Sequence, residues 1–173
     1  MMTPIELLEK WHQRAGRIQT GHYEAACQLE HRHYWLGVPA ITLSLLVSSS
    51  MFSALGQASD SWVKWFVATA SVATAILAGM QTVLRYGERA ASHKIAGVRY
   101  GSVKRELEKF MTFIPEDATA TEAFVERVRV QWDELNEESP SIPQRVWNRV
   151  QRITMLCSKS GRPLKLSNAR DAR

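Results

Sequence analysis

Few side chains in this sequence are spaced so that they could do chemistry. The nearest approach to a metal site is Cys27 with His31, which would share one face of a helix, and His33 close by. Zinc in proteins takes four ligands in most structural sites, so these side chains would bind it only with help from another segment. Solvated side chains are the favoured interpretation, and we expect neither a metal nor a cofactor.

Sequence patterns typical of enzymes are also absent. Residues 87–97, GERAASHKIAG, lack the spacing and the preceding strand of a phosphate-binding loop. The sequence has no His-Glu-x-x-His motif and no Cys-x-x-Cys motif. The two cysteines, Cys27 and Cys157, indicate reduced thiols rather than a disulfide framework. We predict that the protein is not an enzyme.

A second group of polar and small side chains lies inside two uncharged stretches, Tyr34–Ser59 and Trp65–Leu84. Its members are Ser44, Ser48, Ser71, Thr74, Ala78 and Gln81. In one interpretation they line a hydrated path, which requires several copies because a single helical hairpin encloses nothing. In the other, the hydroxyls bond to their own helix and the small side chains only pack. Of the six, Gln81 is the most costly to expose to lipid.

The two uncharged stretches indicate what must hold these side chains. Twenty residues of helix span about 30 Å, which is the thickness of the hydrocarbon core of a bilayer. We therefore predict membrane spans at about residues 35–55 and 65–84, joined by a tight hairpin loop. A hairpin buried in a soluble helical bundle is disfavoured, because so small a domain has few polar helices to cover it.

The distribution of charge predicts the orientation of the hairpin. The basic residues that flank the spans are Arg17, Arg32, Arg85, Arg89, Lys94, Arg99 and Lys104, whereas the loop has Lys64 offset by Asp60. By the positive-inside rule both termini face the cytoplasm. Aromatic residues mark the four span ends: Trp35, Trp62, Trp65 and Tyr86.

Two other interpretations of the charge and of the first apolar stretch are disfavoured. The basic residues are interleaved with glutamates, so we expect no nucleic-acid binding. The first 33 residues are polar, which disfavours a signal peptide.

Four cytoplasmic helices are predicted outside the spans. They cover about residues 4–33, 85–114, 121–138 and 143–157. Thr3, Pro4 and Glu6 form a helix start with a capping box. Apolar positions recur at spacings of three and four along the first two helices, so we expect them to pair antiparallel as a stalk of about 45 Å. Gly97 and Gly101 either permit close contact there or are weak points of the helix.

The border between the second span and the stalk carries no proline and no turn cluster. We therefore predict one helix that continues through Arg85 without a break, from lipid into the cytoplasm.

Residues 158–173 are basic and lack an apolar period, which predicts a disordered tail near the anionic inner leaflet. Residues 1–157 are expected to form a single all-α membrane domain.

Taken together, these features resemble the SLATT family, the SMODS- and SLOG-associating two-transmembrane effectors of bacterial conflict systems. The resemblance covers about residues 5–155. It rests on the long first helix, the hairpin, the segment YGERAASHKIAGVRY after the second span, and the segment SPSIP. The residues that resemble the family signature are Tyr86, Glu88, Arg89, His93, Ala96 and Tyr100. It implies an effector of the bacterial inner membrane that perforates or disrupts the bilayer in antiviral defence.

The resemblance leaves two functions open. The leading one is a homo-oligomer that permeabilises the membrane when a separate sensor or cyclic-nucleotide synthase is triggered, since the chain has no fused sensor domain. The alternative is a non-conducting anchor or scaffold whose cytoplasmic helices bind a partner protein. In the first case the residues that would couple the stalk to the second span are Tyr86, Glu88, Arg89, His93 and Tyr100. The simpler interpretation is that the charged residues among them only fix topology and pair with one another.

Overall fold

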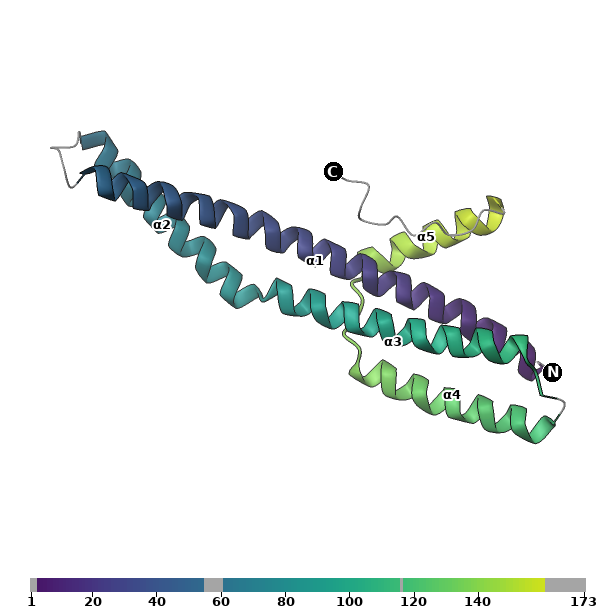
Figure 1. Ribbon diagram of the computed structural model, residues 1–173. Coiled ribbons are helices and arrows are strands. Elements are labelled where there is room, and N and C mark those ends of the chain that lie inside the picture. The colour runs from purple at the N-terminus through teal and green to yellow at the C-terminus, as the bar shows by residue number, and fades with distance from the viewer. Residues whose placement is uncertain (1–2, 55–60, 116, 161–173) are drawn as a thin grey trace. The chain divides into compact units, whose positions relative to one another are not determined.

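The computed structural model describes residues 3–54, 61–115 and 117–160, and helices make up nearly all of them (Figure 1). The helices are α1 (Pro4–Ala54), α2 (Ser61–Leu84), α3 (Tyr86–Thr112), α4 (Ala118–Glu138) and α5 (Gln144–Ser160). No strand occurs in these ranges, so the predicted all-α class is confirmed. Residues 55–60, which contain the end of the first predicted span and most of the predicted loop, lie outside the described residues.

The chain divides into two compact units. One, here called the cytoplasmic unit after the location predicted for it, combines residues 1–26 with residues 91–173. The other, here called the hairpin unit, consists of residues 27–90. The helix α1 contributes to both units, because the predicted first cytoplasmic helix and the predicted first span form one helix from Pro4 to Ala54. Its start is the predicted capping box, in which Thr3 and Glu6 exchange backbone–side-chain hydrogen bonds of 3.1 and 3.3 Å.

The core of the cytoplasmic unit is formed by α1 and α3, which run antiparallel with α4 beside them (Figure 1). The buried side chains are Leu8, Ala15, Ile18, Tyr100, Val103, Leu107, Phe124, Val128, Trp132 and Leu135. The predicted seams of the two stalk helices are therefore confirmed. Where α1 and α3 meet, a Cβ added to Gly97 would lie 3.3 Å from the ring of Tyr23. This glycine permits close helix contact, as one of the two interpretations held.

The ends of α4 and α5 follow from local capping. Asp117 accepts a hydrogen bond from the backbone N–H of Thr119, which starts α4 at Ala118, three residues before the predicted start. The helix α5 follows the SPSIP turn and buries Val146 and Val150 against Ala25 of α1. It continues to Ser160, so the prediction that residues 158–160 belong to a disordered tail is wrong. Residues 161–173 of that tail lie outside the described residues.

One prediction about the backbone is also wrong: the helix is interrupted at Arg85. This residue has φ 45°, in the left-handed region, and it separates the end of α2 at Leu84 from the start of α3 at Tyr86. Hydrogen bonds adjoin the interruption on both sides, since the N–H of Arg85 donates to the carbonyl of Gln81 and the N–H of Arg89 donates to the carbonyl of Arg85. A left-handed conformation is unfavourable for a residue with a Cβ, which makes the junction a strained joint.

Candidate functional site

The hairpin unit presents its large apolar side chains to the outside. In α1 these are Trp35, Val38, Ile41, Leu45 and Leu46, and in α2 they are Trp62, Trp65, Phe66, Val72, Ile76, Met80 and Val83. The helical stretch Lys64–Thr112 contains an 18-residue window that is apolar enough to cross a membrane, and only 6% of that window is buried. Such a surface is stable in lipid but not in water. Side chains at 50–61 lie outside the description, so part of the first predicted span does too.

The contact between the two helices of the hairpin is made of small residues. Ala40 of α1 and Ala70 of α2 are buried there. At the cytoplasmic end of the predicted spans, the side-chain amide of Gln81 lies against the backbone of Gly37: a Cβ there would be 2.7 Å from its Nε2 atom. The polar group of Gln81 therefore occupies a space between α1 and α2 that exists because residue 37 has no side chain.

Each predicted hydroxyl of the hairpin bonds to its own helix. The hydroxyl-to-carbonyl distances are 2.8 Å for Ser44 to Ala40, 2.8 Å for Ser48 to Ser44, 2.7 Å for Ser71 to Val67 and 2.8 Å for Thr74 to Ala70. These bonds satisfy the hydroxyl donor without water. Thr74 is half-buried towards α1, whereas Ser44, Ser48, Ser71 and Ala78 are exposed. The structure therefore does not gather the six predicted residues at one place.

The helix α2 has three distinct faces. One contacts α1 through Ala70, Thr74 and Gln81, and a second carries bulky exposed residues such as Ile76 and Val83. The third face consists of small exposed residues spaced at four, three and four: Ser71, Ala75, Ala78 and Thr82. Beside it a Cβ at Gly79 would meet no atom within 4 Å. This small-residue face is left uncovered by the rest of the hairpin unit.

The junction after α2 carries the first of the predicted coupling residues. Arg85 and Glu88 form an ion pair of 2.8 Å, which is the pairing expected from their spacing. Tyr86 is half-buried, and Glu88 and Arg89 are exposed. These three residues belong to the hairpin unit, whereas His93 and Tyr100 belong to the cytoplasmic unit. The five coupling candidates thus form two groups along α3.

The second group lies in a buried cluster with His22, a residue of the predicted first cytoplasmic helix. The Nδ1 atoms of His22 and His93 are 3.0 Å apart, and both side chains are buried. The ring of Tyr100 stacks on His22 at 5.6 Å, and its hydroxyl donates to Asn136 of α4 at 2.8 Å. One imidazole must donate and the other accept, so the pair holds one proton between these two nitrogens.

Burial in this cluster disfavours charge on both imidazoles. It lowers the pKa of His22 to about 4, with a further contribution from the nearby His93. Burial also lowers the pKa of His93 and raises the pKa of the Tyr100 hydroxyl. All three groups are therefore neutral at neutral pH. The meeting of His22 with His93 was not predicted, although the antiparallel register of the two seams was the signal that could have indicated it.

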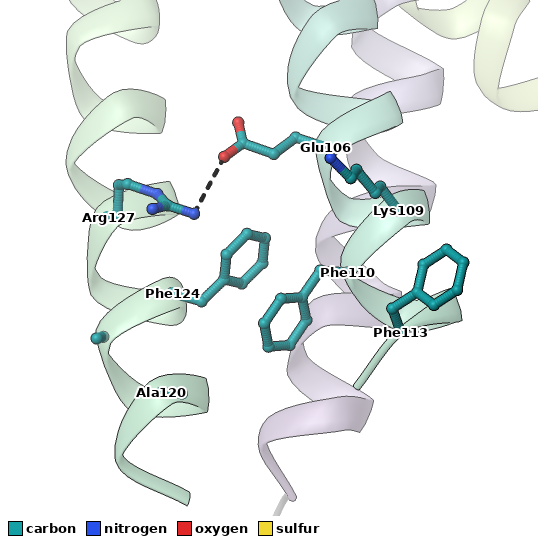
Figure 2. A pocket seen from close by; sticks show the side chains of 8 residues that line it. Glu106, Lys109, Phe110, Phe113, Ala120, Phe124 and Arg127 are labelled. Carbon is teal, nitrogen blue, oxygen red and sulfur yellow. Dashed lines mark ion pairs between the residues drawn. The ribbon is translucent and has the colours of Figure 1, made fainter. Parts of the chain in front are cut away.

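A further hollow lies at the far end of α3, where it faces α4 (Figure 2). The cavity has a volume of about 360 Å³ and is open at the surface. Its floor is the stacked pair of Phe110 and Phe124, whose ring centroids are 3.8 Å apart. At its rim, Arg127 pairs with Glu106 at 3.4 Å. The lining contains one carboxylate and no nucleophile–base pair, so it is suited to contact rather than to catalysis.

The predicted metal ligands are not assembled into a site. Cys27 is a free, exposed cysteine, and His31 and His33 are exposed as well. The rings of His31 and His33 instead lie beside the neighbouring aromatic rings of Trp35 and Tyr34. Among the described residues, no group of three histidine, cysteine, aspartate or glutamate side chains could hold an ion.

Comparisons with known proteins give one match. The model of the family described as "SMODS and SLOG-associating 2TM effector domain family 4" matches residues 8–146. No curated protein and no solved structure matches this chain. The matched range includes α1, α2, α3, α4 and the first turn of α5, with both predicted spans. The protein therefore belongs to the SLATT family of two-transmembrane effector domains, which act in conflict systems and are not a known family of enzymes.

Proposed function

We propose that the protein is a homo-oligomeric effector of the bacterial inner membrane in which several hairpins assemble and permeabilise the bilayer. The observation that carries this proposal is the small-residue face of α2, formed by Ser71, Ala75, Ala78 and Thr82. Side chains this small let two helices approach closely in lipid, where packing replaces the missing hydrophobic drive. The face lies apart from the contact with α1, so a helix of another copy can pack on it.

An assembly is needed because one hairpin has no room for a path. Ala40 and Ala70 fill the contact between α1 and α2, and Gln81 fills the space beside Gly37. Ions or solutes would therefore pass between copies rather than through one copy. In such an assembly Ser44, Ser48 and Ser71 are the exposed hydroxyls that could turn from their own helix towards water.

The composition of the cytoplasmic unit supports a multi-pass topology with both termini on one side. Residues before and after the hairpin, 1–26 and 91–173, belong to one compact unit. A chain that crosses a membrane between these two segments must cross it an even number of times for them to meet. The positive-inside rule then favours the cytoplasm for both termini.

The activating cue is expected to reach the cytoplasmic unit from a separate protein. The family description associates these domains with SMODS and SLOG proteins, which supports a synthase or sensor as the partner. The helix α3 is the route by which such a cue would act, because it carries His93 and Tyr100 in the buried cluster and Tyr86, Glu88 and Arg89 next to α2. Since the helix is interrupted at Arg85, a change in α3 would bend the junction rather than rotate α2 rigidly.

The test is induced expression of the full chain in bacteria, alone and with the partner encoded beside its gene, with membrane potential followed by a voltage-sensitive dye. We expect depolarisation and loss of growth. Replacing Ser71 or Ala78 with leucine should abolish both effects, because leucine prevents close packing on the small-residue face. The matched control is Ile76→Leu, on the bulky exposed face of the same helix, which should leave depolarisation unchanged. Unchanged potential under activating conditions would refute the proposal.

A second function is supported by the hydroxyl geometry. Because every predicted hydroxyl of the hairpin is satisfied by a carbonyl of its own helix, none of these four hydroxyls requires a water path. A non-conducting anchor whose cytoplasmic unit binds a partner fits this observation. In that case Ser71→Leu and Gln81→Leu would leave toxicity unchanged, and the membrane would stay polarised while the partner is bound.

A further inference from the structure

The positive charge of this protein is concentrated near its C-terminal end. Of its 22 lysines and arginines, eight lie in residues 139–173, together with one of its 17 acidic residues. That segment therefore has a net charge of +7, and the 138 residues before it have a net charge of −2. The overall excess of +5 originates in α5 and in the sequence that follows it. A charge imbalance of this size predicts an anionic partner for that segment.

The helix α5 carries its buried apolar residues and its basic residues on neighbouring faces. Val146 and Val150 are buried against Ala25 of α1. On the neighbouring face, Arg145, Arg149 and Arg152 follow one another at spacings of four and three, and all three are exposed. Arg149 pairs with Glu24 of α1 at 2.8 Å.

The other two arginines of this face have no carboxylate partner. Within the part of the chain that the structure describes, Arg145 and Arg152 form neither an ion pair nor a side-chain hydrogen bond. Their guanidinium groups are therefore available to an anion. Planar guanidinium groups bind phosphate through two parallel hydrogen bonds, which makes them well suited to phosphate-bearing surfaces.

The last described turns of α5 also expose apolar side chains. After Val150, the exposed fractions are 44% for Ile153, 65% for Met155 and 62% for Leu156. These three residues surround Arg152 within about one turn of helix. Exposed aliphatic side chains next to cationic ones are the pattern of helices that lie in the interface of an anionic membrane.

We propose that the exposed face of α5 is a second membrane contact, which binds anionic lipid headgroups at the surface of the bilayer. Arg145 and Arg152 bind the lipid phosphates, and Ile153, Met155 and Leu156 enter the boundary between headgroups and acyl chains. The aliphatic side chains favour lipid over nucleic acid, because a phosphodiester backbone offers them no apolar environment. The proposal rests on the hairpin crossing a membrane but not on pore formation.

The attachment of α5 places this face within reach of the bilayer. Its anchor, Ala25, precedes Trp35 at the start of the first predicted span by ten residues. Ten residues extend over no more than about 35 Å even when fully stretched. The 17 residues of α5 add about 25 Å. The length of the connecting chain therefore allows the basic face to reach a membrane that the hairpin crosses.

The test compares the full chain in nanodiscs of neutral phosphatidylcholine with the full chain in nanodiscs that also contain phosphatidylglycerol. Amide hydrogen exchange is measured along α5. We expect slower exchange at residues 152–160 when the anionic lipid is present. The double variant R145Q/R152Q should lose this protection, because each arginine contributes about fivefold to binding at an anionic surface. Exchange at Val146 and Val150 reports whether α5 stays folded.

The matched control is R127Q/R129Q, which removes two exposed arginines from α4 and should keep the protection. Leu156→Ser retains both arginines of α5 and should reduce the protection, because it removes an inserted side chain. Equal exchange in the two lipids would overturn the proposal. So would protection that appears in neutral nanodiscs only after nucleic acid is added, since that result assigns the basic face to a different anion.

Discussion

The hairpin unit and the cytoplasmic unit are built from the same kind of amphipathic helix but place their large apolar side chains on opposite sides. In the cytoplasmic unit Leu8, Val103 and Leu107 are at most 1% exposed. In the hairpin unit Leu45 and Val83 are 65% and 79% exposed, and alanines occupy the helix contact instead. The difference indicates two solvents, since water forces bulky apolar groups inward and lipid does not.

The polar side chains of the two units differ in the same sense. In the hairpin unit the hydroxyls of residues such as Ser71 bond within a single helix. In the cytoplasmic unit the side-chain pairs His22–His93 and Tyr100–Asn136 join different helices. Polar bonds between elements specify how those elements pack, whereas bonds within one helix leave its packing to other copies or to lipid.

The largest expected effect tests whether leucines are buried in the cytoplasmic unit but exposed in the hairpin unit. Leu107→Ala removes a fully buried side chain and should lower the free energy of unfolding by about 2–5 kcal/mol. The matched Leu45→Ala, in the hairpin unit, should change it by no more than about 0.5 kcal/mol. Thermal unfolding in detergent, followed by circular dichroism, measures both. Equal losses would mean that the hairpin buries its leucines and that the comparison is wrong.

A smaller effect concerns the titration of the buried histidines. The pKa of His22 is lowered from 6.5 to about 4 by burial, so the unfolded chain takes up the proton first as the pH falls. Stability is therefore full above about pH 6.5 and should fall by up to about 3 kcal/mol as the pH approaches 4. His93 acts in the same direction, since burial lowers its pKa too.

Denaturant unfolding of the detergent-solubilised protein at several pH values measures this loss. The double variant H22Q/H93Q retains polar side chains that cannot titrate, and it should lose the part of the pH dependence that lies between pH 6.5 and 4. Acidic residues elsewhere titrate in both proteins, so the difference between the two curves isolates the histidines. Coincident curves would show that the pair is not buried as a neutral pair.

The smallest expected effect is at Arg85, the residue that separates α2 from α3. Arg85→Gly should raise the free energy of unfolding by about 1 kcal/mol, because glycine adopts a positive φ without a Cβ clash. The lost ion pair with Glu88 is exposed and contributes little. Arg85→Val is the contrasting variant and should be destabilising, as β-branched residues disfavour this conformation. The measurement is the melting temperature, and a lower value for Arg85→Gly would indicate an uninterrupted helix.

The sequence was sufficient to predict what depends on local patterns. The capping box at Thr3, the apolar seams and the helix bounds follow from residue type and period, and the structure confirms them to within a few residues. The break at Arg85 could not be predicted in this way. Arginine is a good helix former, and neither glycine nor proline occupies the position, so its left-handed conformation depends on tertiary packing.

Predictions about the site were limited by register. The seams of the two stalk helices were predicted, but the contact of His22 with His93 depends on how far α1 and α3 are offset along one another. That offset is set by the whole contact between α1 and α3, which includes the packing of Gly97 against Tyr23. No local sequence pattern encodes it. The extension of α5 to Ser160 was missed because its last turns lack apolar residues at regular spacing.

The cytoplasmic unit is made of two segments that are far apart in the sequence, so they are synthesised at different times. Its first segment leaves the ribosome early, but its partners in α3 follow only after the 64 residues of the hairpin unit. At about 5–20 residues per second the delay is several seconds, during which Leu8 and Ile18 have nothing to cover them. If a nascent chain inserts only one of its two spans, residues 1–26 and residues 91–173 lie on opposite sides of the bilayer. Such a chain stays open to chaperones and proteases, so folding itself checks correct insertion.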